Sequence, residues 1–229
     1  MTRRSLFALV ALSLCPAVLP AQAGGVGRIL DEGVFVVSRA GTAPQTESFK
    51  VVQMDNGLIR ATGQILGADS RLSSVLLCDS LGTPSTYDFI TKTNGVTTLE
   101  VRARPHGRRM AVTSSDNHSN ESMKEVPLNP GTTVILDNGL VHQLYFLTLG
   151  KRTGSVDVIE PRTARQAAYS LVGKGLEPVQ IGRRSITATH YALTGGPSPR
   201  DFWIDDAGRL LKVEIPGAGI VALRDEIPR

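Results

Sequence analysis

The sequence predicts a mainly β protein, in which a curved antiparallel sheet, either a half-barrel or an open barrel, wraps one short apolar helix. Three observations support this fold class. Short apolar stretches are separated at close spacing by Gly, Pro, Asn and Asp, which is typical of strands joined by hairpins. Many of these stretches alternate apolar and polar residues with a period of two, as strands do and helices do not. One stretch, residues 137–149, breaks this rhythm.

Residues 1–23 predict a secretory signal. Two arginines form a basic start, an apolar run follows from Leu6 to Cys15, and Ala21-Gln22-Ala23 gives the small-x-small pattern that signal peptidase accepts. We therefore expect cleavage after Ala23, a periplasmic or secreted location, and one β-rich domain over residues 24–229. The apolar run is shorter than the roughly 20 residues that span a bilayer, so we do not expect an integral membrane protein.

A lipoprotein signal is the alternative interpretation of the same segment. Leu12-Ser13-Leu14-Cys15 loosely resembles a lipid-attachment box, but Leu14 stands where a small residue is required and Pro16 follows the cysteine. We therefore favour Cys15 as one more apolar residue of a signal that is removed.

Charge and cysteine content exclude some classes of partner and some sources of stability. The 229 residues carry 25 basic and 21 acidic side chains, a net charge of +4, of which the two arginines of the signal supply half. A charge this small does not favour nucleic acid or an anionic membrane as the partner. Only Cys78 remains after cleavage, so no internal disulfide is expected, and we expect a buried, unreactive thiol.

The first half of the chain predicts a series of hairpins. Asp55-Asn56-Gly57 and Asn94-Gly95 supply residues that tolerate positive φ, as tight hairpin turns require. Apolar and polar residues alternate clearly in 58–66 and in 96–104, which predicts one buried and one exposed face for each strand. The polar residues 114–122 predict a loop. The expected strands are 33–40, 49–54, 58–66, 72–79, 85–92, 96–104 and 108–114.

Residues 137–149 predict a short helix buried against the sheet. Asp137 suits a helix start, and Gly150 followed by two basic residues suits a helix end. Leu140, Leu144 and Leu147 would lie near one helical face. A strand over 140–149 is the alternative, because so short an apolar run is not decided by its period alone.

The remaining residues predict further strands and a final module of three. In 200–204, Phe202 and Ile204 would lie on one face of the sheet and Trp203 on the other. The expected strands are 155–159, 166–172, 178–182, 185–194, 200–204, 210–215 and 219–224.

A search for chemistry finds no motif of a known catalytic or metal-binding type. The chain has no Gly-x-Ser-x-Gly, no His-Glu-x-x-His, no Cys-x-x-Cys and no phosphate loop. We therefore expect no catalytic residues, no metal and no cofactor, and a protein that is not an enzyme. His142 and His190 fall inside ordered elements, where we expect each to be half-buried and hydrogen-bonded. A hydrolase with an unrecognised site is kept as an alternative.

The segment from Arg200 to Glu214, RDFWIDDAGRLLKVE, resembles the closing hairpin of uncharacterised exported bacterial proteins of domain-of-unknown-function type. The segment Val134-Ile135-Leu136-Asp137-Asn138 is similar too. This resemblance covers about 90 residues and implies a curved antiparallel sheet around a short helix, like the half-barrels of the lipoprotein carriers LolA and LolB. It implies a hydrophobic concavity and supplies no catalytic residues.

Two functional hypotheses follow from these observations. The first is a non-enzymatic periplasmic binding or envelope-maintenance protein that holds a lipophilic molecule in the concavity of the sheet. Its candidate ligand-binding residues are Leu140, Leu144, Tyr145, Leu147 and Trp203. The second is a protein-interaction module that uses edge strands and a basic face to bind another envelope protein. Its candidate partner-binding residues are Arg102, Arg104, Arg108 and Arg109.

Overall fold

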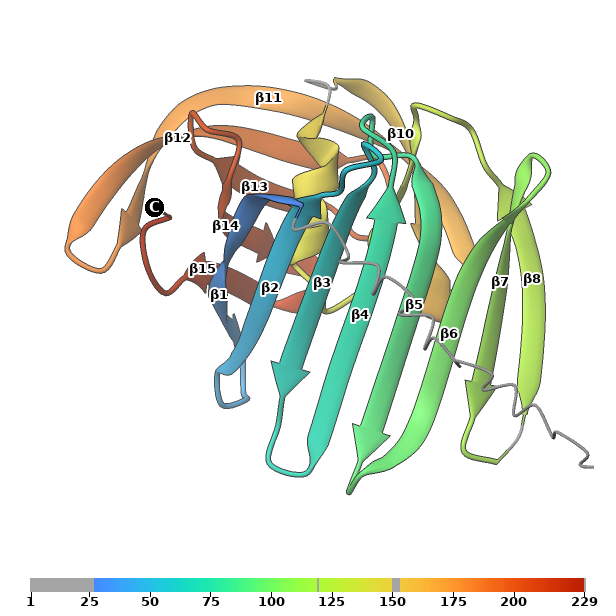
Figure 1. Ribbon diagram of the computed structural model, residues 1–229. Helices are drawn as coiled ribbons and strands as arrows, with labels where there is room; N and C mark the ends of the chain where they lie inside the picture. The colour runs from blue at the N-terminus through green and yellow to red at the C-terminus, as the bar shows by residue number, and fades with distance from the viewer. Residues whose placement is uncertain (1–26, 119, 150–152, 229) are drawn as a thin grey trace, which may run out of the picture.

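Over the described residues of the computed structural model, fifteen strands form one continuous sheet (Figure 1). The structure describes residues 27–118, 120–149 and 153–228, so the expected signal and its cleavage site lie outside the described residues. The strands are β1 (Arg28–Arg39), β2 (Gln45–Gln53), β3 (Ile59–Leu66), β4 (Ser70–Cys78), β5 (Pro84–Thr93), β6 (Val96–His106), β7 (Arg109–Asp116), β8 (Glu121–Pro127), β9 (Thr133–Ile135), β10 (Gly154–Glu160), β11 (Arg165–Ile181), β12 (Arg184–Thr194), β13 (Arg200–Ile204), β14 (Leu210–Ile215) and β15 (Ile220–Arg224).

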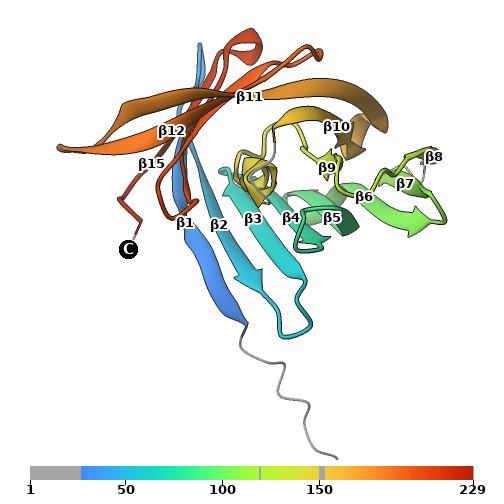
Figure 2. The same cartoon turned by 90° about the horizontal axis from the view of Figure 1, so that it is seen from above.

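The sheet is open and curved, which confirms the predicted fold class. Its strand order runs from β8 back to β1, then from β15 back to β9. Neighbouring strands are antiparallel, except that β9 pairs with β10 in parallel. The two edge strands, β8 and β9, follow each other in the chain, and the sheet curls until its two halves face each other across a common interior (Figure 2).

The period-two patterns place apolar residues on the inner face as predicted. In β3, Ile59, Ala61 and Gly63 are buried and belong to the side that faces the interior, whereas Arg60 is exposed. In β13, Phe202 and Ile204 join the main hydrophobic core. Trp203, between them, joins a second and smaller cluster on the opposite face of the sheet.

The predicted helix is confirmed in its place and its burial, but it is shorter and of a different type. A 3-10 helix, η1 (His142–Leu147), lies inside the curl of the sheet with all six residues buried (Figure 2). Residues 140–149 are therefore not a strand. Asp137 does not cap the helix, since its N-cap is Val141, which makes no side-chain cap bond. Among the described residues, no helix is long and apolar enough to cross a bilayer.

Three other expectations need correction. The polar segment 114–122 is a hairpin between β7 and β8 rather than one long loop, and β8 and β9 were not expected. The two strands expected at 166–172 and 178–182 are one strand, β11, of 17 residues. A bulge at Gly173–Gly175 adds one residue to β11, so the alternation changes face there. Tyr169 and Leu171 consequently face the main core, whereas Val179 faces the second cluster.

Two further 3-10 turns complete the described elements. η3 (Pro161–Thr163) follows β10, and η4 (Pro216–Ala218) joins β14 to β15. Both turns end on a residue with positive φ, Ala164 and Gly219 respectively. They matter here because both contribute residues to the candidate site.

Candidate functional site

The concave face has a closed end, which η1 fills. Leu140, Leu144 and Leu147 are at most 2% exposed and pack into the main core. Tyr145 is 7% exposed, and burial raises the pKa of its hydroxyl to about 12. These four candidate ligand-binding residues lie together, but Trp203, the fifth, lies on the opposite face of the sheet.

A buried carboxylate attaches η1 to the sheet. The Glu47 carboxylate, on β2, accepts hydrogen bonds from the backbone N–H groups of Val141 (2.9 Å) and His142 (3.0 Å). The His142 Nδ1 atom lies 2.5 Å from Glu47 Oε1, and both side chains are fully buried. A Cβ atom on Gly63 would overlap the imidazole, so this glycine lets the ring lie against β3. His142 therefore has a structural partner and faces the interior.

The other end of the concave face is open. In Figure 1 the lower parts of β2 to β5 extend well below η1, so the helix does not cover them. The inward-facing apolar residues there, Val37, Ile65, Leu72 and Leu99, pack against the main core but are only half-buried. Apolar side chains are thus left facing a hollow instead of a packed interior.

Two adjoining cavities occupy this open end. One has a volume of about 640 Å³ and the other about 310 Å³, and they share five lining residues. We call the two cavities together the groove. Their sizes lie in the range of small-molecule binding sites, about 300–1,000 Å³. The shared residues are Arg39, Asn138, Gly139, Arg162 and Ile220.

The lining of the smaller cavity has an apolar wall and a polar part of similar size, and it includes no acidic residue. The wall comes from the inward-facing sides of β1, β3 and β4, with Val141 and Ile220 opposite. Arg39, the last residue of β1, follows Phe35 and Val37 at period two and therefore faces the same side. Arg39 is exposed and has no ion-pair partner among the described residues.

The larger cavity has a polar wall built around Asp137. Its carboxylate accepts a short hydrogen bond from the Tyr87 hydroxyl and lies 2.6 Å from Arg162 Nε. Burial raises the pKa of Asp137, while Arg162 and Tyr87 act in the opposite direction. Burial, followed by the Asp137 charge, raises the pKa of Tyr87 well above its usual range. Asp137 thus holds Arg162 in place at the junction of the two cavities.

A second charged group supports the same wall. The buried Arg200 donates from Nη2 to Asn138 Oδ1 (2.9 Å) and lies 3.7 Å from Glu160 Oε1. Its Nε atom has no partner among the described residues, and burial lowers the pKa of the guanidinium. Gly139 adopts a positive φ of 92° between these groups, a conformation that disfavours any residue with a side chain. With glycine at this position, the loop has no side chain at residue 139, where it borders the groove.

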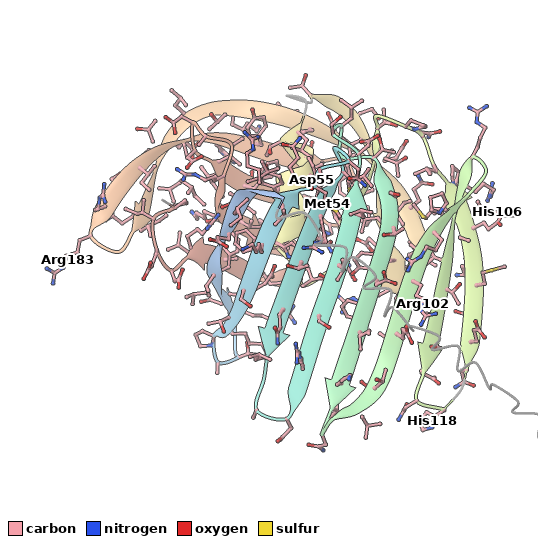
Figure 3. The ribbon with its side chains drawn as sticks, in the orientation of Figure 1. Met54, Asp55, Arg102, His106, His118 and Arg183 are labelled. Atoms are coloured by element: carbon pink, nitrogen blue, oxygen red, sulfur yellow. The ribbon has the colours of Figure 1, made fainter. Side chains whose placement is uncertain are left out.

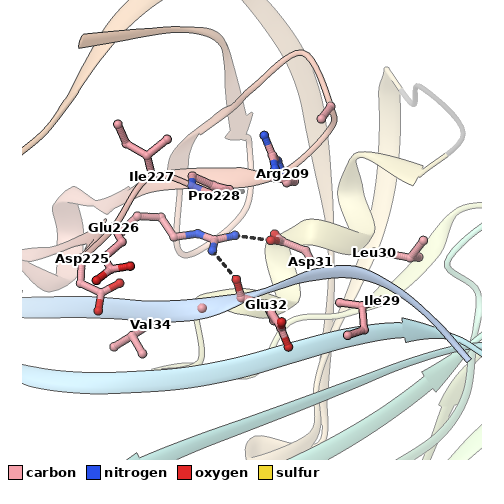
Figure 4. A pocket seen from close by; sticks show the side chains of 13 residues that line it. Ile29, Leu30, Asp31, Glu32, Val34, Arg209, Asp225, Glu226, Ile227 and Pro228 are labelled. Atoms are coloured by element: carbon pink, nitrogen blue, oxygen red, sulfur yellow. Dashed lines mark hydrogen bonds and ion pairs between the residues drawn. The ribbon is translucent and has the colours of Figure 1, made fainter. Parts of the chain in front are cut away.

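Another cavity, of about 720 Å³, lies elsewhere, and a buried ion pair forms part of its lining. Arg224 Nη2 lies 2.5 Å from Asp31 Oδ1, and Figure 4 shows Asp31 among the residues that line this cavity. Burial raises the pKa of Asp31, although Arg224 opposes the shift. The Arg224 guanidinium also stacks over Phe35 and Phe49. We interpret the pair of Asp31 and Arg224 as a structural link between β1 and β15.

His190 belongs to a cluster on the opposite face of the sheet from His142. Its two ring nitrogens lie 2.8 Å from Glu177 Oε1 and 2.8 Å from Asp201 Oδ1. The ring stacks on Trp203 at 4.4 Å, and Lys212 Nζ lies 4.3 Å from the centroid of the same indole. The Trp203 indole and then His190 lower the pKa of Glu177 through hydrogen bonds. Among the described residues, no group of three His, Cys, Asp or Glu side chains is arranged to hold a metal.

The predicted basic face is largely balanced by carboxylates. Arg102 lies along β6, and His106 is the last residue of the same strand, next to the β6–β7 turn (Figure 3). Arg102 pairs with Glu100 at 2.5 Å, and Arg104 pairs with Asp88 at 2.5 Å. Arg109 pairs with Glu125 at 3.1 Å, while Arg108 is exposed in the β6–β7 turn. The use of these four arginines by a partner stays a prediction.

Sequence reasoning did not single out the residues that line the groove. It chose the most apolar segment, whose side chains fill the closed end, and Val141 is the one residue of 140–147 in the groove lining. The signal that could have identified Arg39 is its position, since it ends an apolar, alternating strand on the inward side. The roles of Leu140, Leu144, Tyr145, Leu147 and Trp203 toward a ligand stay predictions.

Comparison with known proteins supports the fold. A crystal structure of a beta-barrel-like protein of domain of unknown function DUF1849 from Brucella abortus is similar, with a TM-score of 0.54 and 10% sequence identity over 86% of this chain and 96% of that chain. A DUF1089 family protein from Pseudomonas aeruginosa has a TM-score of 0.40 and 12% identity over 79% and 93% of the two chains. No protein-family model and no curated protein matches the sequence.

Proposed function

We propose that this protein is a non-enzymatic binding protein of the bacterial envelope and that it holds a lipophilic molecule in the groove. The proposal depends on one observation: half-buried apolar side chains line a hollow at the end of the concave face that η1 does not reach. Apolar surface exposed to water costs roughly 25 cal/mol per Å², so an apolar ligand that covers this wall would bind favourably.

The shape and the lining of the groove favour a small molecule over a partner protein as the ligand. The hollow is concave, has an apolar wall and carries a few fixed polar groups, which is the usual composition of small-molecule sites. The basic face, by contrast, has most of its charge paired within the fold. An acidic partner would have to compete with these carboxylates for the arginines.

We place this activity outside the cytoplasm because of the pattern in residues 1–23. Expression of the full chain in a bacterium, followed by N-terminal sequencing of the product from the periplasm, tests this part of the proposal. A mature chain that begins at Gly24 is expected. A product that stays in the cytoplasm with Met1 in place would contradict it.

Native mass spectrometry of the purified protein tests the ligand itself. We expect a bound mass that transfers to organic solvent and is identified there as a lipophilic molecule. Two adjacent residues of β3 provide matched variants, because Ile65 lines the groove while Leu66 is 59% exposed on the opposite face. Ile65→Asn should abolish the bound mass and the binding of a fluorescent alkyl-chain probe, whereas Leu66→Asn should retain both. Equal binding by the two variants, or no binding by the original protein, would overturn the proposal.

A further inference from the structure

Two arginines stand where the apolar and polar walls of the groove meet. Arg39 and Arg162 line both cavities. Arg162 uses Nε to bind Asp137, and its guanidinium lies 4.9 Å from the centroid of the Phe89 ring. Its Nη2 atom lies beside Gly139, so this side of the guanidinium faces the groove. Arg39 has its whole guanidinium available, since no described residue pairs with it.

Arg39 differs from the other charged groups around the groove in having no ion-pair partner among the described residues. Arg162 binds Asp137, Arg200 lies 3.7 Å from Glu160, and the buried Glu47 is bound by Val141 and His142. Arg39 is therefore the guanidinium that can take an added anionic group, and the carboxylates of Asp137 and Glu160 would repel a ligand with more than one negative charge. Guanidinium groups bind a carboxylate through paired N–H donors that match its two oxygens.

The apolar side of the groove has limited room. The cavity between Arg39 and the apolar wall has a volume of about 310 Å³, near the lower limit for small-molecule sites of about 300 Å³. Val37 on β1, Ile65 on β3 and Leu72 on β4 form this wall beyond the arginines, with β2 between β1 and β3. A ligand that uses both features would place an anionic group at the arginines and one apolar chain across the strands.

We infer that the groove binds a single-chain amphiphile with one negative charge, whose carboxylate contacts Arg39 and the free side of Arg162. This inference rests on the proposed function, since it specifies the ligand of the same groove. Arg39 supplies most of the preference for the anion, because Arg162 is already shared with Asp137.

Four twelve-carbon probes that differ in the head group test the inference: laurate, dodecanol, dodecyl phosphate and dodecylammonium. Their affinities for the full chain would be measured by calorimetry below the concentrations at which they form micelles. We expect laurate to bind about tenfold more tightly than dodecanol, as one charge-assisted contact at a partly exposed site supplies. Dodecylammonium should bind most weakly, and added salt should narrow the difference between laurate and dodecanol.

Arg39→Gln should lower the affinity for laurate to that of dodecanol and leave dodecanol binding unchanged. Arg60→Gln is the matched control. Arg60 is an exposed arginine on the outer face of β3, and its replacement by Gln changes the net charge by the same amount as Arg39→Gln. This control should bind all four probes like the original protein. Arg39 is itself exposed, so its variant should fold, which circular dichroism would verify.

The outcomes separate the inference from the proposed function. If neither laurate nor dodecanol binds, the proposed function fails and the inference fails with it. If both bind equally, or if Arg39→Gln keeps the preference for laurate, the function stands and the inference is overturned. Tighter binding of dodecyl phosphate than of laurate would show that the site takes a phosphate head group and would also overturn it.

Discussion

The two ends of the concave face are built from the same strands but differ in how far their inward-facing side chains are buried. At the closed end, inward-facing residues such as Phe49 and Leu76 meet η1 and are fully or nearly buried. At the open end, Ile65 and Leu72 continue the same inward-facing series but stay half-buried, because η1 begins beside Glu47, the register partner of Ile65, and extends away from this end. A strand's own pattern therefore specifies which side chains face inward, while a segment some 70–90 residues later decides whether they are covered.

Removing the attachment of η1 to β2, at the closed end, should cause the largest loss of stability. Glu47→Leu leaves two backbone N–H groups and the His142 ring without their buried acceptor. We expect the free energy of unfolding to fall by about 3–5 kcal/mol, measured by urea denaturation. Glu32→Leu, which removes an exposed carboxylate paired with Lys50, should cost no more than about 1 kcal/mol. Equal losses in the two variants would contradict the role given to Glu47.

Packing within the closed end should show the next largest effect. Leu144 is fully buried, so Leu144→Ala would create a cavity beside the sheet. We expect a loss of about 2–4 kcal/mol in the free energy of unfolding. Leu72→Ala, at the open end, should cost clearly less, because the side chain is already half exposed. Similar losses in urea denaturation would show that the open end is packed after all.

The pH dependence of stability should reveal the burial of Tyr145. Its pKa is about 12 in the folded protein and about 10 when exposed, so the unfolded chain loses this proton first as the pH rises. The contribution is therefore fully present below about pH 10 and is lost between about pH 10 and 12. Partial access of water to this side chain should limit the loss to about 1 kcal/mol.

Tyr145→Phe provides the comparison for this pH effect. Tyr87 also has a raised pKa and remains in both proteins, so the difference between their unfolding curves at pH 9 and pH 11.5 isolates Tyr145. The variant should lose less stability over this interval. Parallel curves would mean that the hydroxyl of Tyr145 is as exposed in the folded protein as in the unfolded chain.

Filling the open end should have the smallest effect on stability and a clear effect on binding. Thr91, on β5, is half-buried and lines the groove, so Thr91→Trp would place an indole in the hollow. We expect the free energy of unfolding to change by less than about 1 kcal/mol and the alkyl-chain probe to stop binding. Lys92→Trp, on the adjacent outward position, should bind the probe normally. Retained binding by Thr91→Trp would place the ligand elsewhere.

Much of the fold could be predicted because strands carry local information. The alternation in 58–66 and the opposite faces of Phe202 and Trp203 follow from a period of two and require no knowledge of distant residues. The helix at 142–147 was located because the segment 137–149 is nearly all apolar beyond its first residues and breaks the strand rhythm, but its start was misplaced. Asp137 is an ordinary cap by its local sequence, and only the fold shows that it binds Tyr87 and Arg162 instead.

The candidate site could not be predicted, because the local pattern of a strand does not show which distant residues lie beside it. Its residues come from β1, β3, β4, the loop before η1, and η3, and each looks ordinary within its own segment. The bulge that joins two expected strands into β11 was also missed, because Gly173 and Gly175 read equally well as a turn. Which face of a strand is covered, and which residues lie opposite it across the curled sheet, depends on contacts between segments that are far apart in the sequence.

The pairing of β1 with β15 has a consequence for the order of assembly. It joins residues as far apart in the chain as Phe35 and Arg224, while most other neighbouring strands are connected by short turns. Closing so long a loop is entropically costly, so we expect local hairpins to form early and this seam to be the slow, late step. Until then the two half-sheets are separate ribbons, and the hollow that we assign to the ligand does not exist.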